Sequence, residues 1–220
     1  MNSLLDVFML TDKLVTYLKK KGFAFTSEGY PVFAKEMFLN EIPDLIVPVQ
    51  QRKNRRVRNK KKTVISFFCG DEYIYRRLAK ILDEIDEYKE YMGVIGSDIT
   101  VTQDMDLEWQ RAIILLNQLV MAVFAANGIK IVLNTRMGSR ETKDMFRYMP
   151  KGIMIASGFR GGDRECSNND FGYVAKVLSF LPSKLLIYGR CHKSVLKRLD
   201  TLGIEYVLYK DFRDLCREVA

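Results

Sequence analysis

The sequence contains a single histidine, His192, and only four cysteines, which lie far apart in the chain. One histidine excludes histidine-rich metal sites and mechanisms that need two histidines. Cys69, Cys166, Cys191 and Cys216 form no CxxC pair, whereas zinc sites usually bring their ligands in close pairs. We therefore expect structural or incidental thiols in a reducing compartment, with no zinc or redox role.

Familiar catalytic and nucleotide-binding motifs are also missing. The chain has no GxxxxGK[ST], GxGxxG, GxSxG or HExxH. Its two glycine-rich pieces, residues 136–141 and 157–165, are interpreted as turns, although their backbone N–H groups could face a phosphate. The sequence therefore specifies no reaction and identifies no cofactor.

A targeting signal and a long apolar run are lacking as well. The start, MNSLLDVFMLTDK, has no basic region and contains Asp6 and Asp12, which argues against a signal peptide. The most apolar stretch, residues 112–126, is interrupted by Asn117 and Gln118 and is shorter than the roughly 20 residues that cross a bilayer. We expect a cytoplasmic protein that does not enter a membrane.

The positive charge is concentrated in one short segment. Residues 51–62, QRKNRRVRNKKK, contain no acidic residue and eight of the 35 basic residues of the chain, and the remaining 27 match the 27 acidic residues. The eight are Arg52, Lys53, Arg55, Arg56, Arg58, Lys60, Lys61 and Lys62. We call residues 51–62 the basic segment. Because like charges repel, we expect it to be poorly ordered until it meets an anionic partner.

Three interpretations of the basic segment remain open. It is a solvated loop, a site for nucleic acid, or a contact for an acidic protein or a membrane surface. A nucleic-acid contact would be made through phosphate, with affinity that falls steeply as salt rises. The segment has no aromatic residue between its basic residues, so it favours non-specific phosphate binding over base stacking.

The rest of the chain follows a strand–helix rhythm. Apolar strand patterns at 64–68, 93–97, 129–134, 152–158, 184–189 and 204–209 are each followed by a helical pattern. Strands in such a series pair in parallel through crossover helices. This predicts an α/β fold of parallel βα units, either a TIM-barrel-like closed or partial barrel, which we favour, or an open doubly wound sheet.

The predicted organisation has three parts. Residues 1–50 form an N-terminal extension, with a helix at 3–21 and a hairpin at 23–33, packed on the main domain. Residues 51–62 form a basic linker or arm. Residues 63–220 form the α/β domain, a size that suits one core.

In either architecture a ligand site lies at the carboxyl ends of the strands. The candidates there for catalysis or binding are Asp71, Asp98, Asn134, Arg136, Arg160, Arg190 and His192. Asp71 and Asp98 are also weak candidates to hold a divalent metal through carboxylate oxygens, and the arginines suit a phosphate-bearing substrate. The alternative interpretation is that the carboxylates cap helices and that His192 begins a helix.

Several segments occur in a recognisable order: DLIVPVQ, VISFFCGDEY, YMGVIGSDIT, a long helix with Trp109, GIKIVLNT, PKGIMIASG and KLLIYG. This set resembles the family called domain of unknown function 4417, over about residues 40–210. The resemblance implies a protein of phages and bacterial mobile elements, located in the host cytoplasm if a phage encodes it. It supplies no activity but favours nucleic-acid transactions.

The resemblance also concerns individual residues. Family members have paired aromatics and two aspartates after the first strand, and another aspartate after the second. Here Phe67 and Phe68 match the aromatics, Asp71 matches one aspartate and Asp98 the later one. Gly70 stands where the other acid would be, which weakens a two-carboxylate metal site.

Three functional hypotheses follow. The leading one is a phage or mobile-element protein that engages nucleic acid through the basic segment, with the α/β domain as scaffold. The second is an enzyme that acts on a phosphorylated or nucleotide substrate at the strand ends. The third is a non-catalytic interaction protein.

Overall fold

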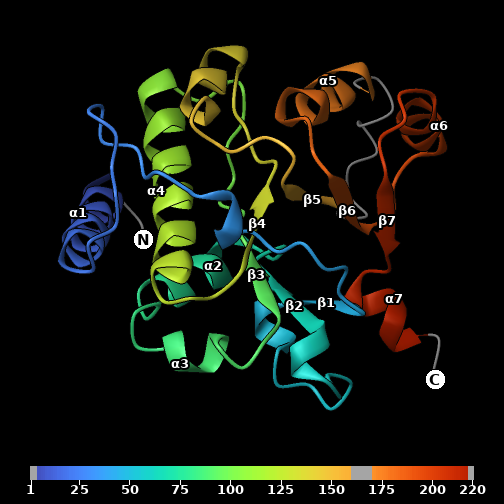
Figure 1. Cartoon of the computed structure of the whole chain (residues 1–220), viewed down its shortest axis with the longest axis horizontal. Helices are drawn as coiled ribbons and strands as arrows, with labels where there is room; N and C mark the ends of the chain where they lie inside the picture. Colours follow the sequence, from blue (N-terminus) through green and yellow to red (C-terminus); the bar gives the residue numbers. More distant parts are fainter. Residues whose placement is uncertain (1–3, 160–169, 218–220) are drawn as a thin grey trace.

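The structure of the chain is a computed structural model that describes residues 4–159 and 170–217. Within these residues seven strands form one all-parallel sheet, whose spatial order follows the sequence from β1 to β7 (Figure 1). The strands are β1 (Leu45–Pro48), β2 (Thr63–Ser66), β3 (Gly93–Ile95), β4 (Ile131–Asn134), β5 (Met154–Phe159), β6 (Lys184–Gly189) and β7 (Tyr206–Tyr209). Each connection must therefore cross back along the sheet.

The sheet curls into a nearly closed barrel, in which side chains from every strand meet in one interior cluster. This cluster comprises Ile46, Val64, Ile95, Val132, Met154, Ala156, Leu186 and Tyr188, with Val207 and Tyr209 packed against it. Alternate residues of the same strands, such as Ile65, Leu133 and Ile187, belong to an outer cluster shared with the helices. A doubly wound sheet would instead be covered by helices on both faces, so the predicted barrel-like form is confirmed.

The interior of the barrel is a packed core, as in other small barrels. Phe68, which follows β2, stacks on Tyr188 of β6 with ring centroids 5.5 Å apart. The Tyr188 hydroxyl accepts a hydrogen bond from the Phe212 N–H at 2.8 Å. At the amino ends of the strands Leu39 joins the interior cluster, and its N–H donates to the Ile131 carbonyl at 2.8 Å.

The edge strands β1 and β7 are bridged by a side chain. Tyr209, at the end of β7, donates its hydroxyl proton to the carbonyl oxygen of Pro43, just before β1, over 2.7 Å. Burial raises the pKa of Tyr209 to about 12, so the hydroxyl keeps its proton at neutral pH. One hydrogen bond therefore spans the place where backbone pairing would complete the barrel.

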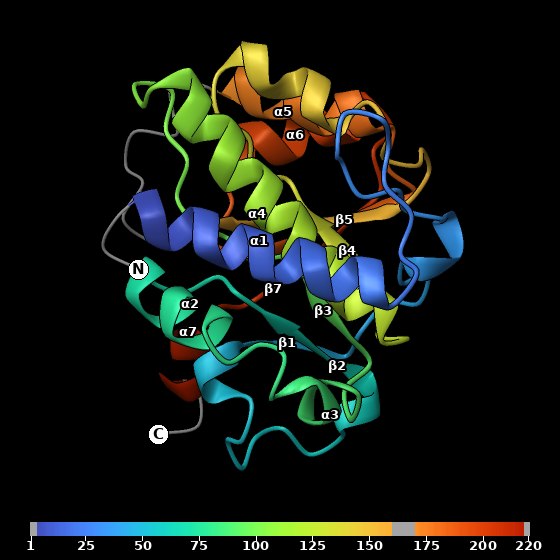
Figure 2. The same ribbon diagram turned by 90° about the vertical axis from the view of Figure 1, so that its left-hand side faces the viewer.

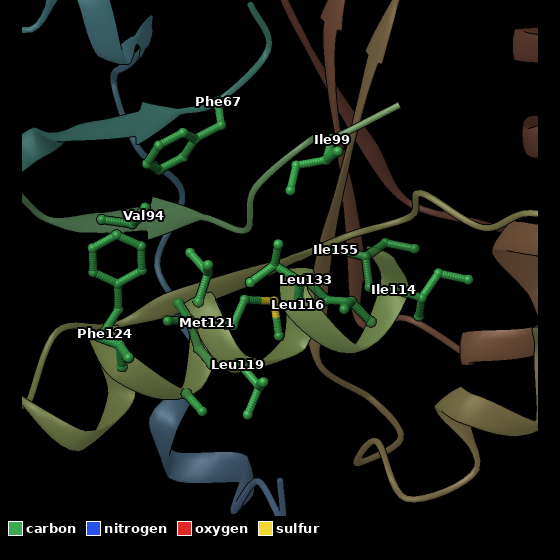
Figure 3. Close-up of a cluster of buried hydrophobic side chains, with 14 of the residues drawn as sticks. Phe67, Val94, Ile99, Ile114, Leu116, Leu119, Met121, Phe124, Leu133 and Ile155 are labelled. Carbon is green, nitrogen blue, oxygen red and sulfur yellow. The ribbon is translucent and has the colours of Figure 1, made fainter. Parts of the chain in front are cut away.

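Helices cover the outside of the barrel (Figure 1). They are α1 (Leu4–Lys20), α2 (Asp71–Leu78), α3 (Ile85–Tyr88), α4 (Leu107–Ala126), α5 (Asp170–Phe180), α6 (Lys193–Thr201) and α7 (Phe212–Arg217), with 3-10 turns η1 (Lys35–Met37), η2 (Val49–Gln51), η3 (Lys60–Lys62) and η4 (Arg140–Phe146). In Figure 3, Met121 and Phe124 of α4 lie against Val94 of β3 and Leu133 of β4. The outer core is therefore built mainly on α4.

Helix α4 is the one helix of the described residues that is long and apolar enough to cross a membrane, and 61% of its 18-residue apolar window is buried inside the fold. It lies between the sheet and α1, which runs across its outer side (Figure 2). Asp106 caps its first turn by accepting hydrogen bonds from the N–H groups of Glu108 and Trp109. Its apolar character is therefore explained by packing on two sides.

The N-terminal elements follow the prediction. Helix α1 ends before Gly22, which has a φ of 73° and so adopts the left-handed conformation that ends many helices. The expected hairpin is a short one, with an antiparallel bridge between Phe25 and Pro31. Tyr17 of α1 donates its hydroxyl proton to Asn127, at the end of α4, over 3.0 Å. These contacts pack the extension on the barrel.

Two features differ from the sequence prediction. The sheet has a seventh strand, β1, within the segment that was placed in the extension. The helical pattern that follows the predicted strand at 64–68 spans residues 71–92, and in the structure it divides into α2 and α3. No glycine or proline lies in the break, residues 79–84; Glu84, its last residue, forms an ion pair with Arg77 at 2.6 Å and lies 3.9 Å from the distant Arg52. Tertiary contacts thus override the helical pattern here.

Gly158 provides a test of the barrel interior. A Cβ atom at this position would lie 2.5 Å from Cδ1 of Phe68, so the aromatic ring would have to move. We expect Gly158→Ala to lower the free energy of unfolding by about 1–3 kcal/mol, measured by urea denaturation. Adding Phe68→Leu should relieve the clash, so the double variant should lose less than the sum of the two single losses. Additive losses would contradict this packing.

Candidate nucleic-acid interface

The basic segment forms most of the connection between β1 and β2. Residues 49–62 leave the carboxyl end of β1 through η2 and return to the amino end of β2 through η3. An α-helix usually makes such a crossover between parallel strands, but here the two 3-10 turns and the bends between them replace it. The segment is therefore an integral part of the barrel wall.

Arg52 anchors this connection and is only 6% exposed. Its Nε and Nη2 donate to the two carboxylate oxygens of Glu87 at 2.8 and 3.0 Å, and its Nη1 donates to the carbonyl of Val49 at 2.9 Å. The Tyr91 hydroxyl donates to the Arg52 carbonyl at 2.7 Å. A bidentate pair of this kind fixes geometry as well as charge. Arg52 is therefore a structural residue, and it is not placed to contact a nucleic acid.

A row of glutamates faces the basic segment. Glu84, Glu87 and Glu90, which we call the glutamate row, are spaced three residues apart and so share one side of α3 and its flanks. Burial raises the pKa of Glu87, but the hydrogen bonds and charge of Arg52, followed by those of Lys53, lower it below its ordinary value of 4.5. Glu87 is therefore ionised at neutral pH.

Two further basic residues pair with the same row. Lys53 Nζ lies 3.3 Å from Glu87 Oε1, and Lys60 forms an ion pair with Glu90. Between the segment and α3 lies a groove of about 450 Å³, lined by Arg52, Lys53, Asn54, Val57, Lys60, Asp86, Glu87 and Glu90. One wall of this groove is mainly basic and the other is acidic.

The other basic residues lie mostly on the surface. Arg55, Arg58, Lys61 and Lys62 are exposed, and among the described residues none of them forms an ion pair with a carboxylate. Lys61 Nζ donates to the Lys89 carbonyl at 3.0 Å. Arg56 is half-buried and its Nη2 donates to the carbonyl of Cys216, in α7, at 3.4 Å. These exposed side chains belong to the connection on the outside of the barrel.

At the strand ends, three of the predicted site residues meet. Asp98 Oδ1 accepts hydrogen bonds from Asn134 Nδ2 at 2.8 Å and from Arg136 Nε at 2.9 Å. Its Oδ2 accepts a third from Arg136 Nη2 at 3.1 Å. Asn134 also donates to the Ser97 carbonyl at 3.1 Å. This strand-end cluster links the loop after β3 to the end of β4.

Asp71 belongs to a separate link between loops. It lies in the first turn of α2 and accepts hydrogen bonds from the N–H and hydroxyl of Thr100, the latter at 3.1 Å. The nearby Asp98 is already engaged by Arg136 and Asn134. No group of three or more potential metal ligands occurs within residues 4–159 and 170–217. The arrangement therefore favours loop-linking roles for both carboxylates over a shared metal ion.

The remaining candidates do not join this cluster. Arg190 pairs with Asp214 of α7 through contacts of 3.2 and 3.3 Å. His192 is exposed at the start of α6, with its Nδ1 2.9 Å from Ser194 Oγ. Arg160 and the second glycine-rich piece, apart from its first residues, lie outside the described residues, as does Cys166; Cys69, Cys191 and Cys216 carry free thiols.

The comparison with protein families identifies the chain. The family model described as Domain of unknown function (DUF4417) matches residues 30–209. The chain belongs to this family. No curated protein and no solved structure shows significant similarity to it. The resemblance seen in the sequence is therefore confirmed, and DUF4417 membership brings no activity with it.

In this DUF4417 protein the glutamate row is the part of the site that sequence reasoning missed. The sequence DEIDEYKE contains the required signal, because Glu84, Glu87 and Glu90 recur at helical spacing. Without knowledge of the fold, nothing in the sequence indicates that this row faces the basic segment. Counting charges over the whole chain therefore did not reveal that the basic segment pairs with the glutamate row.

Arg52 gives the first test of this DUF4417 site. Replacing Arg52 by Gln leaves Glu87 without its bidentate partner in a setting where its side chain is only 20% exposed. We expect the free energy of unfolding to fall by about 2–4 kcal/mol. The exposed Arg58→Gln, which removes the same charge from the same segment, should leave it unchanged. Urea denaturation of both variants measures the difference, and equal stability would contradict an anchoring role for Arg52.

The pH dependence of this loss follows from the pKa of Glu87. The pKa of Glu87 is lower in the folded state than in the unfolded state. The stabilisation that ionised Glu87 gives the folded protein is therefore fully present above the unfolded pKa, and it is lost as the pH falls through the folded pKa. The difference between wild type and Arg52→Gln should therefore be largest near pH 7 and shrink below about pH 4.5. Urea denaturation at several pH values between 7 and 3 tests this, and a constant difference would contradict it.

Asp98 tests the strand-end cluster. The Asp98→Asn variant removes the negative charge that holds Arg136, so we expect a loss of about 1–2 kcal/mol in the free energy of unfolding. Asp86→Asn makes the same chemical change at a carboxylate whose side chain is 93% exposed and paired with Lys89, and we expect no measurable effect there. Indistinguishable variants in thermal or urea unfolding would contradict a structural role for Asp98.

Proposed function

We propose that this protein binds the phosphate backbone of nucleic acid with the exposed residues of the basic segment, without reading base sequence. The observation that carries the proposal is that Arg55, Arg58, Lys61 and Lys62 are exposed within one stretch of eight residues, on a segment that Arg52 anchors. A role in a phage or mobile element would suit such an activity.

The anchoring of the segment supports this proposal energetically. Ordering a flexible arm on binding costs conformational entropy for every residue that is fixed. Here Arg52, Tyr91 and the two 3-10 turns already hold the backbone, so much of that cost is met on folding. The proposal differs from the sequence-based one in its contacts: Arg55, Arg58, Lys61 and Lys62 replace the full set of eight basic residues, and Arg52 supports the surface without contacting phosphate.

The chemistry of the exposed residues supports phosphate as the ligand. Guanidinium and ammonium groups attract phosphate at any base sequence and release its counterions. The basic segment contains no aromatic residue on which a base could stack. Binding should therefore depend strongly on salt and weakly on sequence.

A variant of four residues tests the proposal. Replacing Arg55, Arg58, Lys61 and Lys62 by Gln should weaken binding to a labelled DNA duplex and to single-stranded RNA. The slope of log affinity against log salt should become shallower by about three, since each lost phosphate contact contributes roughly 0.7–0.9. Fluorescence anisotropy over a range of salt concentrations measures both quantities.

The matched control removes the same charge elsewhere. Lys13, Lys19, Lys20 and Lys21 are exposed on α1 and the turn after it, so their replacement by Gln should leave the salt slope close to that of wild type. Thermal unfolding checks that both variants fold. Equal binding by the two variants, or no binding by the wild type at low salt, would contradict the proposal.

A further inference from the structure

The groove beside α3 brings carboxylates next to basic side chains. Its acidic wall contains Glu87 and Glu90, and its basic wall contains Lys53 and Lys60. Carboxylate and phosphate compete for the same donors, because both present oxygen acceptors with negative charge. Glu87 and Glu90 therefore occupy two basic groups of the same segment, Lys53 and Lys60, that are not among the four residues of the proposed nucleic-acid surface.

The two glutamates differ in how firmly they are held. Glu87 is 20% exposed and bonded to both Arg52 and Lys53, so it remains part of the anchor. Glu90 is 54% exposed, and its partner Lys60 is 42% exposed. The hydrogen bond to Glu90 raises the pKa of Lys60, which is therefore fully charged at neutral pH. Exposed pairs of this kind contribute little to stability and can be exchanged at small cost.

We propose that Glu90 competes with nucleic-acid phosphate for Lys60, so that binding exchanges an internal ion pair for a phosphate contact. This inference rests on the proposed function and adds an internal regulator to it. Glu90 then limits the affinity of the surface. Lys60 becomes a phosphate contact only when Glu90 releases it.

The expected size of the effect follows from elementary electrostatics. Two unit charges a few ångströms apart in water change an equilibrium by roughly fivefold. Salt screens this interaction over a Debye length of about 10 Å at 0.1 M. Glu90→Gln should therefore tighten binding by roughly fivefold at low salt. Because Lys60 then contributes a full counterion release, the salt slope should also steepen by about 0.7–0.9.

A double-mutant cycle separates exchange at Lys60 from general repulsion. The cycle uses wild type, Lys60→Gln, Glu90→Gln and the double variant, each bound to the same labelled DNA duplex. If Glu90 acts through Lys60, the gain from Glu90→Gln should fall from roughly fivefold to less than about twofold when Lys60 is already Gln. An equal gain in both backgrounds would overturn the exchange, as would no gain at all.

The control removes a negative charge from an equivalent exposed pair far from the groove. Asp144 of η4 is 44% exposed and pairs with Arg111 at 3.2 Å, and in Figures 1 and 2 η4 lies at the opposite end of the molecule from α3. Asp144→Asn should leave binding unchanged, and an equal gain there would overturn the exchange. Failure of the wild type to bind would remove the proposed function together with this inference, whereas binding without a Glu90 effect would remove this inference alone.

Discussion

Parallel strands that are neighbours in sequence need a connection that returns along the outside of the sheet, and between β1 and β2 most of that connection is a segment with eight positive charges. Such a segment repels itself and contributes little apolar packing. The guanidinium of Arg52, bonded to both carboxylate oxygens of Glu87, holds it against α3. β1, a short strand at the edge of the sheet, pairs with β2 alone, so this attachment adds a second link between the edge of the barrel and its helices.

Other side-chain contacts span the place where the barrel is incompletely closed. β1 and β7 are both edge strands, and exposed strand edges tend to pair with other chains. Here the Tyr209 hydroxyl reaches Pro43 across the gap, and Arg56 of the basic segment reaches the carbonyl of Cys216 in α7. Charged residues and a short helix therefore protect the edge of the sheet next to β1, in place of an eighth strand.

Much of the fold was predictable because the strands from β2 to β7 are apolar runs separated by amphipathic helices. β1 was missed because its four residues are followed by a short 3-10 turn and then by the charged segment, and not by a helix. The division of residues 71–92 was missed because Glu84 also lies 3.9 Å from Arg52, a contact that depends on the fold and that propensity cannot reveal. At the site, the exposed basic residues follow from composition alone. The structural role of Arg52 does not, because it depends on which segment lies opposite.

The pairing of each arginine decides what it can bind. Arg136 directs two N–H groups at Asp98, so a phosphate at the strand ends would meet a carboxylate and would have to replace it. Arg55 and Arg58 have no such partner among the described residues, and Glu87 and Glu90 in the groove already hold Arg52, Lys53 and Lys60. A phosphate therefore meets less competition on the outer wall of the barrel than at its mouth. This difference favours a backbone-binding surface over a phosphate-binding active site.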